Sequence, residues 1–269
     1  MQVAARLIRA ASLAAIALTT GCSPQAGGDI HRAATDPSAA GERGYVPPPE
    51  LTGAARTGQG VDLAGTANPG AEVRLASPKG AVLVARADAK GGWRLTAPAS
   101  SEPRLLGLSM SDHGRIAQAK GYLFLAPDGE AARLRAGGGS EALAGAAPGL
   151  IAAAHDYDDQ RAATLSGRAA PGEAVSLRVD GVERGQASAD AERRFVLPLN
   201  QPLSPGAHDF DLSGAGGETH FTANIAAPAP LAGSPFRASR EAAGWRVDWL
   251  TPGGGEQTTL IFDPAEPRA

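Results

Sequence analysis

The sequence predicts an all-β protein made of two tandem antiparallel β-sandwich repeats and a C-terminal β-meander, following a disordered N-terminal tether. Three observations support this fold class. The stretch 63–95 recurs 102 residues later without a gap. Apolar residues in each copy alternate with polar ones, which is the period of strands with one buried face. The 35 glycines and 21 prolines among 269 residues favour many turns and short strands over long helices.

Residues 1–21 have the features of a secretory signal peptide. Arg6 and Arg9 precede an apolar run at 10–18, which is too short to cross the roughly 30 Å of a bilayer core. Cys22, the only cysteine of the chain, follows Thr19-Thr20-Gly21. This junction resembles the bacterial lipobox, in which the cysteine is lipidated and becomes the mature N-terminus, although Thr19 stands where leucine is usual. The alternative is an ordinary secreted protein in which Cys22 is incidental.

The lipobox resemblance implies a lipid-anchored protein of a bacterial envelope. By resemblance to enterobacterial lipoprotein sorting, Ser23 after the cysteine implies the outer membrane, facing the periplasm, more than the inner membrane. One cysteine allows no intramolecular disulfide, so the stability has to come from core packing. The 25 basic and 28 acidic residues give a net charge of −3 without a basic stripe, which argues against nucleic acid as a partner. Residues 22–60 are rich in Gly, Ala, Ser and Pro without a sustained period, which predicts a disordered tether.

The repeat starts with 63–75, and its second copy starts with 165–177. In each copy a Pro-Gly pair separates two short alternating stretches, which predicts a type II turn between a hairpin-like pair of strands. Further alternation predicts six to seven strands per copy, with repeat 1 at 61–126 and repeat 2 at 163–228. The identical columns, in the numbers of the first copy, are Leu63, Gly65, Ala67, Pro69, Gly70, Val73, Leu75, Ala85, Ala87, Asp88, Ala89 and Leu95.

The pattern Leu-x-Gly-x-Ala-x-Pro-Gly-x-x-Val-x-Leu, followed by Ala-Asp-Ala and an aromatic-x-Leu strand, resembles the bacterial immunoglobulin-like modules of surface and periplasmic proteins. The aromatic residue is Trp93 in the first copy and Phe195 in the second. The resemblance implies two immunoglobulin-like antiparallel β-sandwiches. Modules of this family act as spacers, as adhesive surfaces or beside peptidoglycan-binding domains, which implies a structural or binding role. Distinct binding is expected at the loops 77–86 and 179–188, where the copies differ.

A three-strand meander is predicted for 229–269, with strands at 236–239, 245–249 and 258–262. The connecting segment 127–162 is predicted to be a linker or a degenerate copy of this meander, because the glycine triplet at 253–255 has a counterpart at 137–139. A glycine triplet could suggest a phosphate-binding loop, but neither the strand-to-helix context nor a following Lys-Ser/Thr is present. A flexible hairpin loop is expected instead.

Trp245, Val247 and Trp249 are the candidate binding residues, because they share one face of a predicted strand and could form a platform on which a sugar stacks. Packing in a core is the favoured interpretation, since large aromatic side chains usually fill cores. The polar cluster from His155 to Asp159 could bind calcium. Alternate strand positions point to opposite faces, however, so a solvated linker is expected and no metal site is assigned.

The group His208, Asp209, Asp211 and His220 lacks a nucleophile in a recognisable elbow, so no catalytic residue and no cofactor are assigned. The sequence therefore predicts a non-enzymatic, lipid-anchored envelope protein, with Cys22 lipidated, that acts as a structural or binding module towards an envelope protein or peptidoglycan. The alternatives are an accessory glycan-binding or hydrolytic carbohydrate-active protein that uses the Trp-bearing meander, and a calcium-stabilised adhesin.

Overall fold

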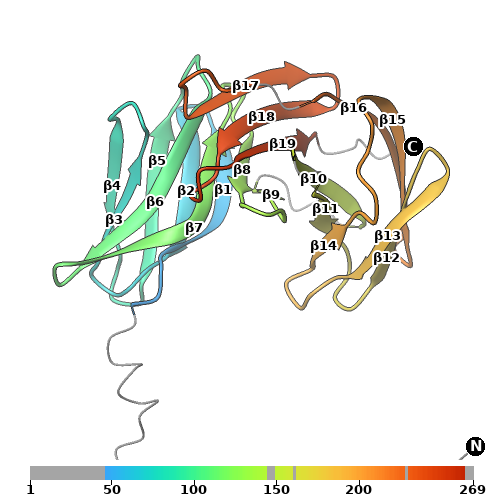
Figure 1. Ribbon diagram of the computed structural model, residues 1–269. Helices are drawn as coiled ribbons and strands as arrows, with labels where there is room; N and C mark the ends of the chain where they lie inside the picture. Colours follow the sequence, from blue (N-terminus) through green and yellow to red (C-terminus); the bar gives the residue numbers. More distant parts are fainter. Residues whose placement is uncertain (1–45, 144–148, 160–161, 228–229, 264–269) are drawn as a thin grey trace, which may run out of the picture. The chain divides into compact units, whose positions relative to one another are not determined.

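The described part of the chain is an all-β structure. The computed structural model describes residues 46–143, 149–159, 162–227 and 230–263, which belong to one compact unit, Val46–Ala269. Within these ranges the regular secondary structure consists entirely of β-strands, and the strands pair in antiparallel fashion (Figure 1). This confirms the predicted fold class. The described residues contain no helix long and apolar enough to cross a membrane. The predicted signal peptide, Cys22 and the tether up to residue 45 lie outside the described residues.

The first sandwich packs a three-stranded sheet, in the order β1-β2-β5, against four strands in the order β4-β3-β6-β7. Seven antiparallel strands divided in this way between two sheets form an immunoglobulin-like architecture. The strands are β1 (Glu50–Thr57), β2 (Gly60–Thr66), β3 (Glu72–Ala76), β4 (Val82–Arg86), β5 (Gly92–Pro98), β6 (Arg104–Asp112) and β7 (Arg115–Leu125).

The second sandwich repeats this arrangement strand for strand. Its three-stranded part has the order β14-β11-β10, and its four-stranded sheet has the order β13-β12-β15-β16. The strands are β10 (Ile151–Asp158), β11 (Ala163–Arg168), β12 (Ala174–Val179), β13 (Val182–Ser188), β14 (Arg194–Pro198), β15 (Gly206–Gly214) and β16 (Gly217–Ile225). Each sandwich encloses its own apolar core, as the duplicated alternation predicted.

The first strand of each sandwich lies outside the predicted repeat boundaries. β1 occupies residues assigned to the tether at 22–60, and β10 occupies residues assigned to the connecting segment at 127–162. Both strands carry a bulge, after Leu51 and after Ala152, which interrupts the period of two. In addition, six consecutive side chains of β10 are buried, so no alternation marks it as a strand.

The repeated Pro-Gly forms the predicted type II turn but not a hairpin. In the first copy the Ala71 N–H donates to the Asn68 carbonyl (3.0 Å), and Gly70 has φ 75°. The strands on either side, β2 and β3, belong to different sheets. The turn therefore carries the chain from one layer of the sandwich to the other, and the predicted hairpin-like pairing is wrong.

The repeated glycine, Gly65 or Gly167, is required by close packing. A Cβ atom on Gly65 would lie 2.0 Å from the Glu50 carbonyl and 2.4 Å from the Trp93 ring, and Gly167 lies in the same way against Ile151 and a phenylalanine ring. The aromatic residue of the fifth strand thus covers the glycine of the second. The glycine and the aromatic ring are therefore one packing unit of the framework.

Each sandwich is extended by additional strands. β8 (Ala131–Leu134) and β9 (Glu141–Ala142), which lie within the segment 127–162, continue the first four-stranded sheet beyond β7. β17 (Phe236–Glu241), β18 (Gly244–Leu250) and β19 (Glu256–Phe262), drawn in red in Figure 1, form the predicted C-terminal meander. This meander joins the second sandwich because β19 pairs with β10. Two six-stranded sheets result.

Candidate functional site

A third apolar cluster joins the first sandwich to the C-terminal meander. Phe124 belongs to this cluster, whereas its neighbours Leu123 and Leu125 belong to the first core, so the cluster lies on the opposite face of β7. Ile261 likewise belongs to it, while the side chains on either side of Ile261 in β19 pack in the second core. We call this contact region between the two six-stranded sheets, together with the polar groups described below, the seam.

The candidate binding residues Trp245, Val247 and Trp249 lie in the seam. Their exposed fractions are 8%, 0% and 0%. The Trp245 Nε1–H donates to Asp128 Oδ2 (3.0 Å) and the Trp249 Nε1–H to Thr259 Oγ1 (3.1 Å), so both indole donors are used inside the protein. The Arg240 guanidinium lies over the Trp245 ring, 6.0 Å from its centroid, and the Trp249 ring is fully buried. Trp245, Val247 and Trp249 therefore pack as core residues, which is the interpretation that the sequence favoured, and their burial gives no support to a glycan platform.

Asp156 is the polar centre of the seam. Its buried carboxylate accepts hydrogen bonds from the backbone N–H of Ser140 (2.9 Å), the hydroxyl of Ser140 (2.7 Å), Gln257 Nε2 (3.1 Å) and the hydroxyl of Thr259 (2.6 Å). Burial raises the pKa of Asp156, and these four donors oppose the shift by stabilising the charged form. One carboxylate thus ties the loop between β8 and β9 to β10 and β19.

Gln257 and Ser166 hold the same loop from the second sandwich. The Gln257 Nε2–H donates to the Arg135 carbonyl (2.8 Å), and its Oε1 accepts from the Gly137 N–H (2.9 Å), so the amide pairs with the loop backbone on both sides. The Ser166 hydroxyl donates to the Ser140 carbonyl. The loop 135–140 joins the paired strands β8 and β9, as the expected hairpin loop does, and it is held at several points by the second sandwich.

The glycine triplet allows the loop to approach the second sandwich closely. Gly137, Gly138 and Gly139 have φ values of 80°, 105° and 81°, a region that favours glycine. A Cβ atom on Gly138 would lie 2.2 Å from Thr164 Oγ1, and one on Gly139 would lie 3.0 Å from Val196. Larger residues would therefore push the loop away from β11 and β14.

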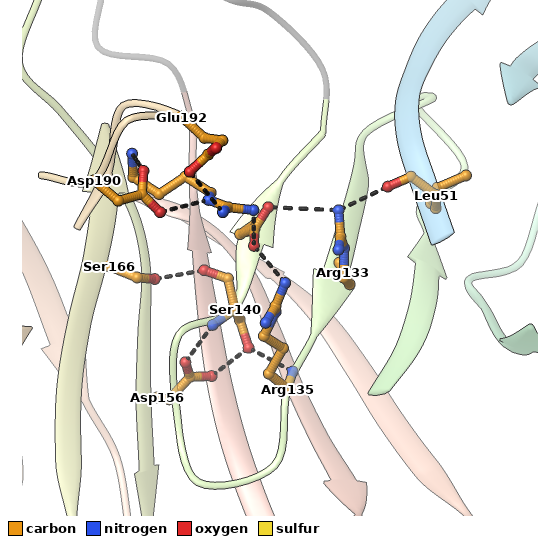
Figure 2. Close-up of polar contacts among 10 residues, drawn as sticks. Leu51, Arg133, Arg135, Ser140, Asp156, Ser166, Asp190 and Glu192 are labelled. Atoms are coloured by element: carbon orange, nitrogen blue, oxygen red, sulfur yellow. Dashed lines mark hydrogen bonds and ion pairs between the residues drawn. The ribbon is translucent and has the colours of Figure 1, made fainter. Parts of the chain in front are cut away.

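A charged cluster borders the seam (Figure 2). Glu141 in β9 is 2.9 Å from Arg135 Nη2, 3.6 Å from Arg133 Nη2 and 4.0 Å from Arg194 Nη1. Arg133 also donates to the Leu51 carbonyl of β1 (2.7 Å). Burial lowers the pKa of Arg133. One carboxylate is therefore shared by three guanidinium groups from both sandwiches.

Arg194 is held in place by two further acidic residues. Its Nε–H donates to Asp190 Oδ2 (3.0 Å), and its Nη2 contacts Glu192 Oε2 (3.4 Å). Burial opposes the charge of Arg194, but its hydrogen bond to Asp190 and the negative charges of Glu141, Asp190 and Glu192 together raise its pKa. The preceding residue, Arg193, has a left-handed φ of 71°, at the position that Gly91 occupies in the first copy.

A cleft of about 330 Å³ opens beside this cluster. The loop at Gly138–Glu141 forms one wall, and β11 and β14 form the other. Arg135, Arg168 and Arg194 line the cleft together with Glu141 and Asp190. Its remaining lining is small or apolar: Gly138, Gly139, Ser140, Ala142, Ala153, Ser166, Gly167, Ser188, Phe195 and Val196.

The predicted polar cluster at 155–159 is split between two faces. His155 and Asp156 are buried in β10, so the expected solvated linker is wrong for these two residues. His155 packs against Tyr157 and Phe210 in the second core, and burial lowers its pKa to about 4. Asp156 points into the seam. In the described ranges no three His, Cys, Asp or Glu side chains come together as metal ligands.

The other histidine groups are separate pairs. His208 Nδ1 lies 2.6 Å from Asp180 Oδ2 and its Nε2 lies 2.8 Å from the Ser204 carbonyl, which pins a loop to β15. Burial acts to lower the pKa of His208, but the hydrogen bonds with Asp180 and the Ser204 carbonyl and the charge of Asp180 together raise it. His220 pairs with Asp211 across neighbouring strands (2.6 Å). These pairs do not converge on a common centre.

The sequence analysis did not identify Arg135, Glu141, Asp156 or Arg194 as members of one site. These residues come from two predicted segments, the connecting segment 127–162 and repeat 2 at 163–228, and a local sequence pattern carries no information about the contacts that they make in the fold. The glycine triplet at 137–139 was the available signal, because such a run marks close backbone approach as well as flexibility. Ser188 lies within the segment 179–188, where distinct binding was expected, and it lines the cleft.

No family model matches the chain, and no curated protein matches it. Thirteen chains of solved structures match it, and three of them are described next. The BSP domain of a biofilm-associated protein is 12% identical, with a TM-score of 0.22, over 68% of this chain and 30% of that chain. The central fibronectin-III array of RIM-binding protein is 11% identical, with a TM-score of 0.25, over 80% and 89%. Invasin, a bacterial integrin-binding protein, is 13% identical, with a TM-score of 0.21, over 79% and 54%.

At these identities and TM-scores the alignments carry no argument about function. The description of the chain as two immunoglobulin-like sandwiches rests on its own strand order. The seam and the cleft beside it are therefore the features from which a function has to be argued.

Proposed function

We propose that this chain is a non-enzymatic, lipid-anchored protein of the bacterial envelope whose two sandwiches act together as one binding module. The observation that carries the proposal is the polar centre of the seam. Asp156 accepts hydrogen bonds from residues 16, 101 and 103 positions away in the sequence, all of them buried. A linker between independent modules has no need of such a network.

The apolar part of the seam supports the same proposal. Interfaces between domains of one chain are usually polar and permit relative motion. Here Phe124, Val247 and Trp249 are fully buried between the sheets. Burying a large aromatic side chain contributes about 1.5–3 kcal/mol. Two such rings, with a satisfied polar network beside them, favour one fixed arrangement of the sandwiches.

A fixed arrangement suits a binding protein. Surfaces that are already in the bound geometry lose less conformational entropy when a partner associates. The partner in this proposal is an envelope protein or the cell-wall polymer. The sandwiches supply the scaffold, and the loops and the cleft supply the contacts.

The anchor is the second part of the proposal. Cys22 stands after an apolar run and small residues, as in a lipobox, and β1 begins at Glu50. A flexible chain of about 28 residues would have an end-to-end distance of about 30 Å. Such a tether would hold the module away from the surface of the bilayer while several acyl chains keep it attached.

Fractionation of cells tests the anchor. The wild-type chain should collect with the membranes, and Cys22→Ser should move it to the soluble fraction. Unchanged fractionation of Cys22→Ser would contradict lipidation at this residue.

Crosslinking in intact cells tests the binding role. Capture of the full chain should recover a defined envelope protein or glycan, and Gly138→Ala, which disturbs the seam, should lower the yield. Gly137→Ala is the matched control, because a Cβ atom at that position meets nothing within 4 Å. Recovery of neither protein nor glycan by the wild-type chain would count against the proposal.

A further inference from the structure

The cleft beside the seam is built at positions where the two copies differ. At the constant offset of 102, Arg168 replaces Thr66 and Arg194 replaces Gly92, while the turn residue Asp190 matches Asp88. The two copies thus share the turn residue, whereas they differ at the arginines that line the cleft in the second copy.

The turn that presents Arg194 is strained. Arg193 has a φ of 71°, in the left-handed region that non-glycine residues rarely adopt. The first copy has glycine at the equivalent position 91, which adopts such a conformation without a steric cost. Strain of this kind is commonly found at functional sites, and here it lies directly beside the cleft.

The cleft has an excess of positive charge within an acidic chain. Arg135, Arg168 and Arg194 line it against Glu141 and Asp190, whereas the whole chain has a net charge of −3. The side chains of Arg135 and Glu141 are 34% and 20% exposed, so charge interactions there are screened less than at an open surface.

The guanidinium groups retain capacity for another acceptor. Arg194 Nη1 points to Glu141 Oε1 but lies 4.0 Å from it, which is beyond hydrogen-bond length. Within the described residues, the buried Nε atom of Arg135, which lines the cleft, has no hydrogen-bond partner. The arginines of the cluster are therefore not saturated by the carboxylates that the chain itself supplies.

We propose that this cleft binds the free carboxylate at the end of a short peptide with small side chains, between Arg135 and Arg194. Planar guanidinium groups match carboxylates in shape and form charge-assisted hydrogen bonds with them. The neighbouring walls, Ala142, Ala153 and Val196, are apolar and leave room for methyl groups. A volume of about 330 Å³ holds a ligand of about two small residues.

This inference rests on the proposed binding role but does not depend on the lipid anchor. Two sources have the required chemistry, the C-terminus of a protein and the end of a cell-wall stem peptide. The probes are N-acetyl-L-alanyl-L-alanine and N-acetyl-D-alanyl-D-alanine, titrated into the ¹⁵N-labelled protein and followed by NMR. At least one of them should bind saturably and shift the signals of Ser188, Gly139 and Arg194.

The C-terminal amide of the better probe is the matched ligand control. The amide should bind about tenfold more weakly, because it has lost the charge that the arginines recognise. Preference for the L,L probe assigns the ligand to protein C-termini, and preference for the D,D probe assigns it to stem peptides. Either preference supports a carboxylate site.

Arg194→Gln should weaken binding of the acid at least about fivefold, and Arg193→Gln should leave it unchanged. The two variants change the charge equally in one turn, but Arg193 does not line the cleft. Equal affinity for acid and amide, equal effects of the two variants, or no saturable binding of either probe would overturn the proposal. None of these results would affect the seam, which is tested separately by measuring the distance between the two sandwiches.

Discussion

Gly138→Ala is expected to destabilise the protein by forcing the loop 135–140 away from the second sandwich. The added Cβ atom would lie 2.2 Å from Thr164 Oγ1 and 2.9 Å from its Cγ2, and φ is 105°. A left-handed conformation costs an L-residue about 1–2 kcal/mol. Overpacking against Thr164 adds about 1–3 kcal/mol. The expected loss in the free energy of unfolding is therefore about 2–5 kcal/mol.

Gly137→Ala is the control for the backbone contribution. Its φ is 80° and its Cβ atom would meet nothing within 4 Å, so a loss of about 1–2 kcal/mol is expected. The assay is urea unfolding of both variants, with the slope of the transition checked for a common value.

A double-mutant cycle isolates the contact between the two sandwiches. Thr164→Ala removes the hydroxyl and methyl groups that face Gly138, and it should recover about 1 kcal/mol in the Gly138→Ala background. A loss for Gly138→Ala no greater than that for Gly137→Ala, or no recovery with Thr164→Ala, would refute the reasoning.

Three further predictions concern single residues. Burial raises the pKa of Glu130 to about 7, from 4.5 for the unfolded chain. The free energy of unfolding should therefore fall as the pH rises from 4.5 through 7, because the buried carboxyl group has to become charged. Glu130→Gln should therefore melt at a higher temperature than the wild type at pH 8 and show no such gain at pH 4. Burial lowers the pKa of His155 to about 4, from 6.5, so the wild type should lose up to about 3 kcal/mol as the pH falls from 6.5 to 4. His155→Gln should lack that loss in urea unfolding at the two pH values. Arg193→Gly should raise the free energy of unfolding by about 0.5–1 kcal/mol in the same assay. Glycine removes the steric strain of the left-handed conformation of Arg193, and this gain exceeds the conformational entropy that glycine loses on folding.

The duplicated sandwich could be predicted because its signal is local. Matching positions, such as the glycine at 65 and 167 and the aromatic residue at 93 and 195, lie within one copy, and each has a packing reason that the structure shows. The first strands could not be found in the same way. β10 lies between β11 and β19 within its sheet, and its side chains are buried on both faces of that sheet. Its sequence therefore lacks the alternation that marks a strand with one solvated face.

The seam could not be predicted because it depends on contacts between distant segments. The spacing of Trp245, Val247 and Trp249 correctly places them on one face, but the spacing is the same whether that face meets solvent or another sheet. Asp156 shows the same limit from the polar side. In the sequence Asp156 lies beside His155 and Tyr157, which suggests an exposed polar cluster. In the fold its hydrogen bonds with the distant residues Ser140 and Gln257 make it the centre of a buried network.

The distance between the two sandwiches tests the central claim most directly. Ile116 in β7 and Val182 in β13 are exposed by 73% and 53%, so spin labels can be attached there through cysteines in a Cys22→Ser background. Pulsed electron spin resonance on this protein should give one narrow distance distribution, which broadens when Gly138→Ala is added. A broad or multiple distribution for the protein with an intact seam would contradict the claim that the two sandwiches act as one module.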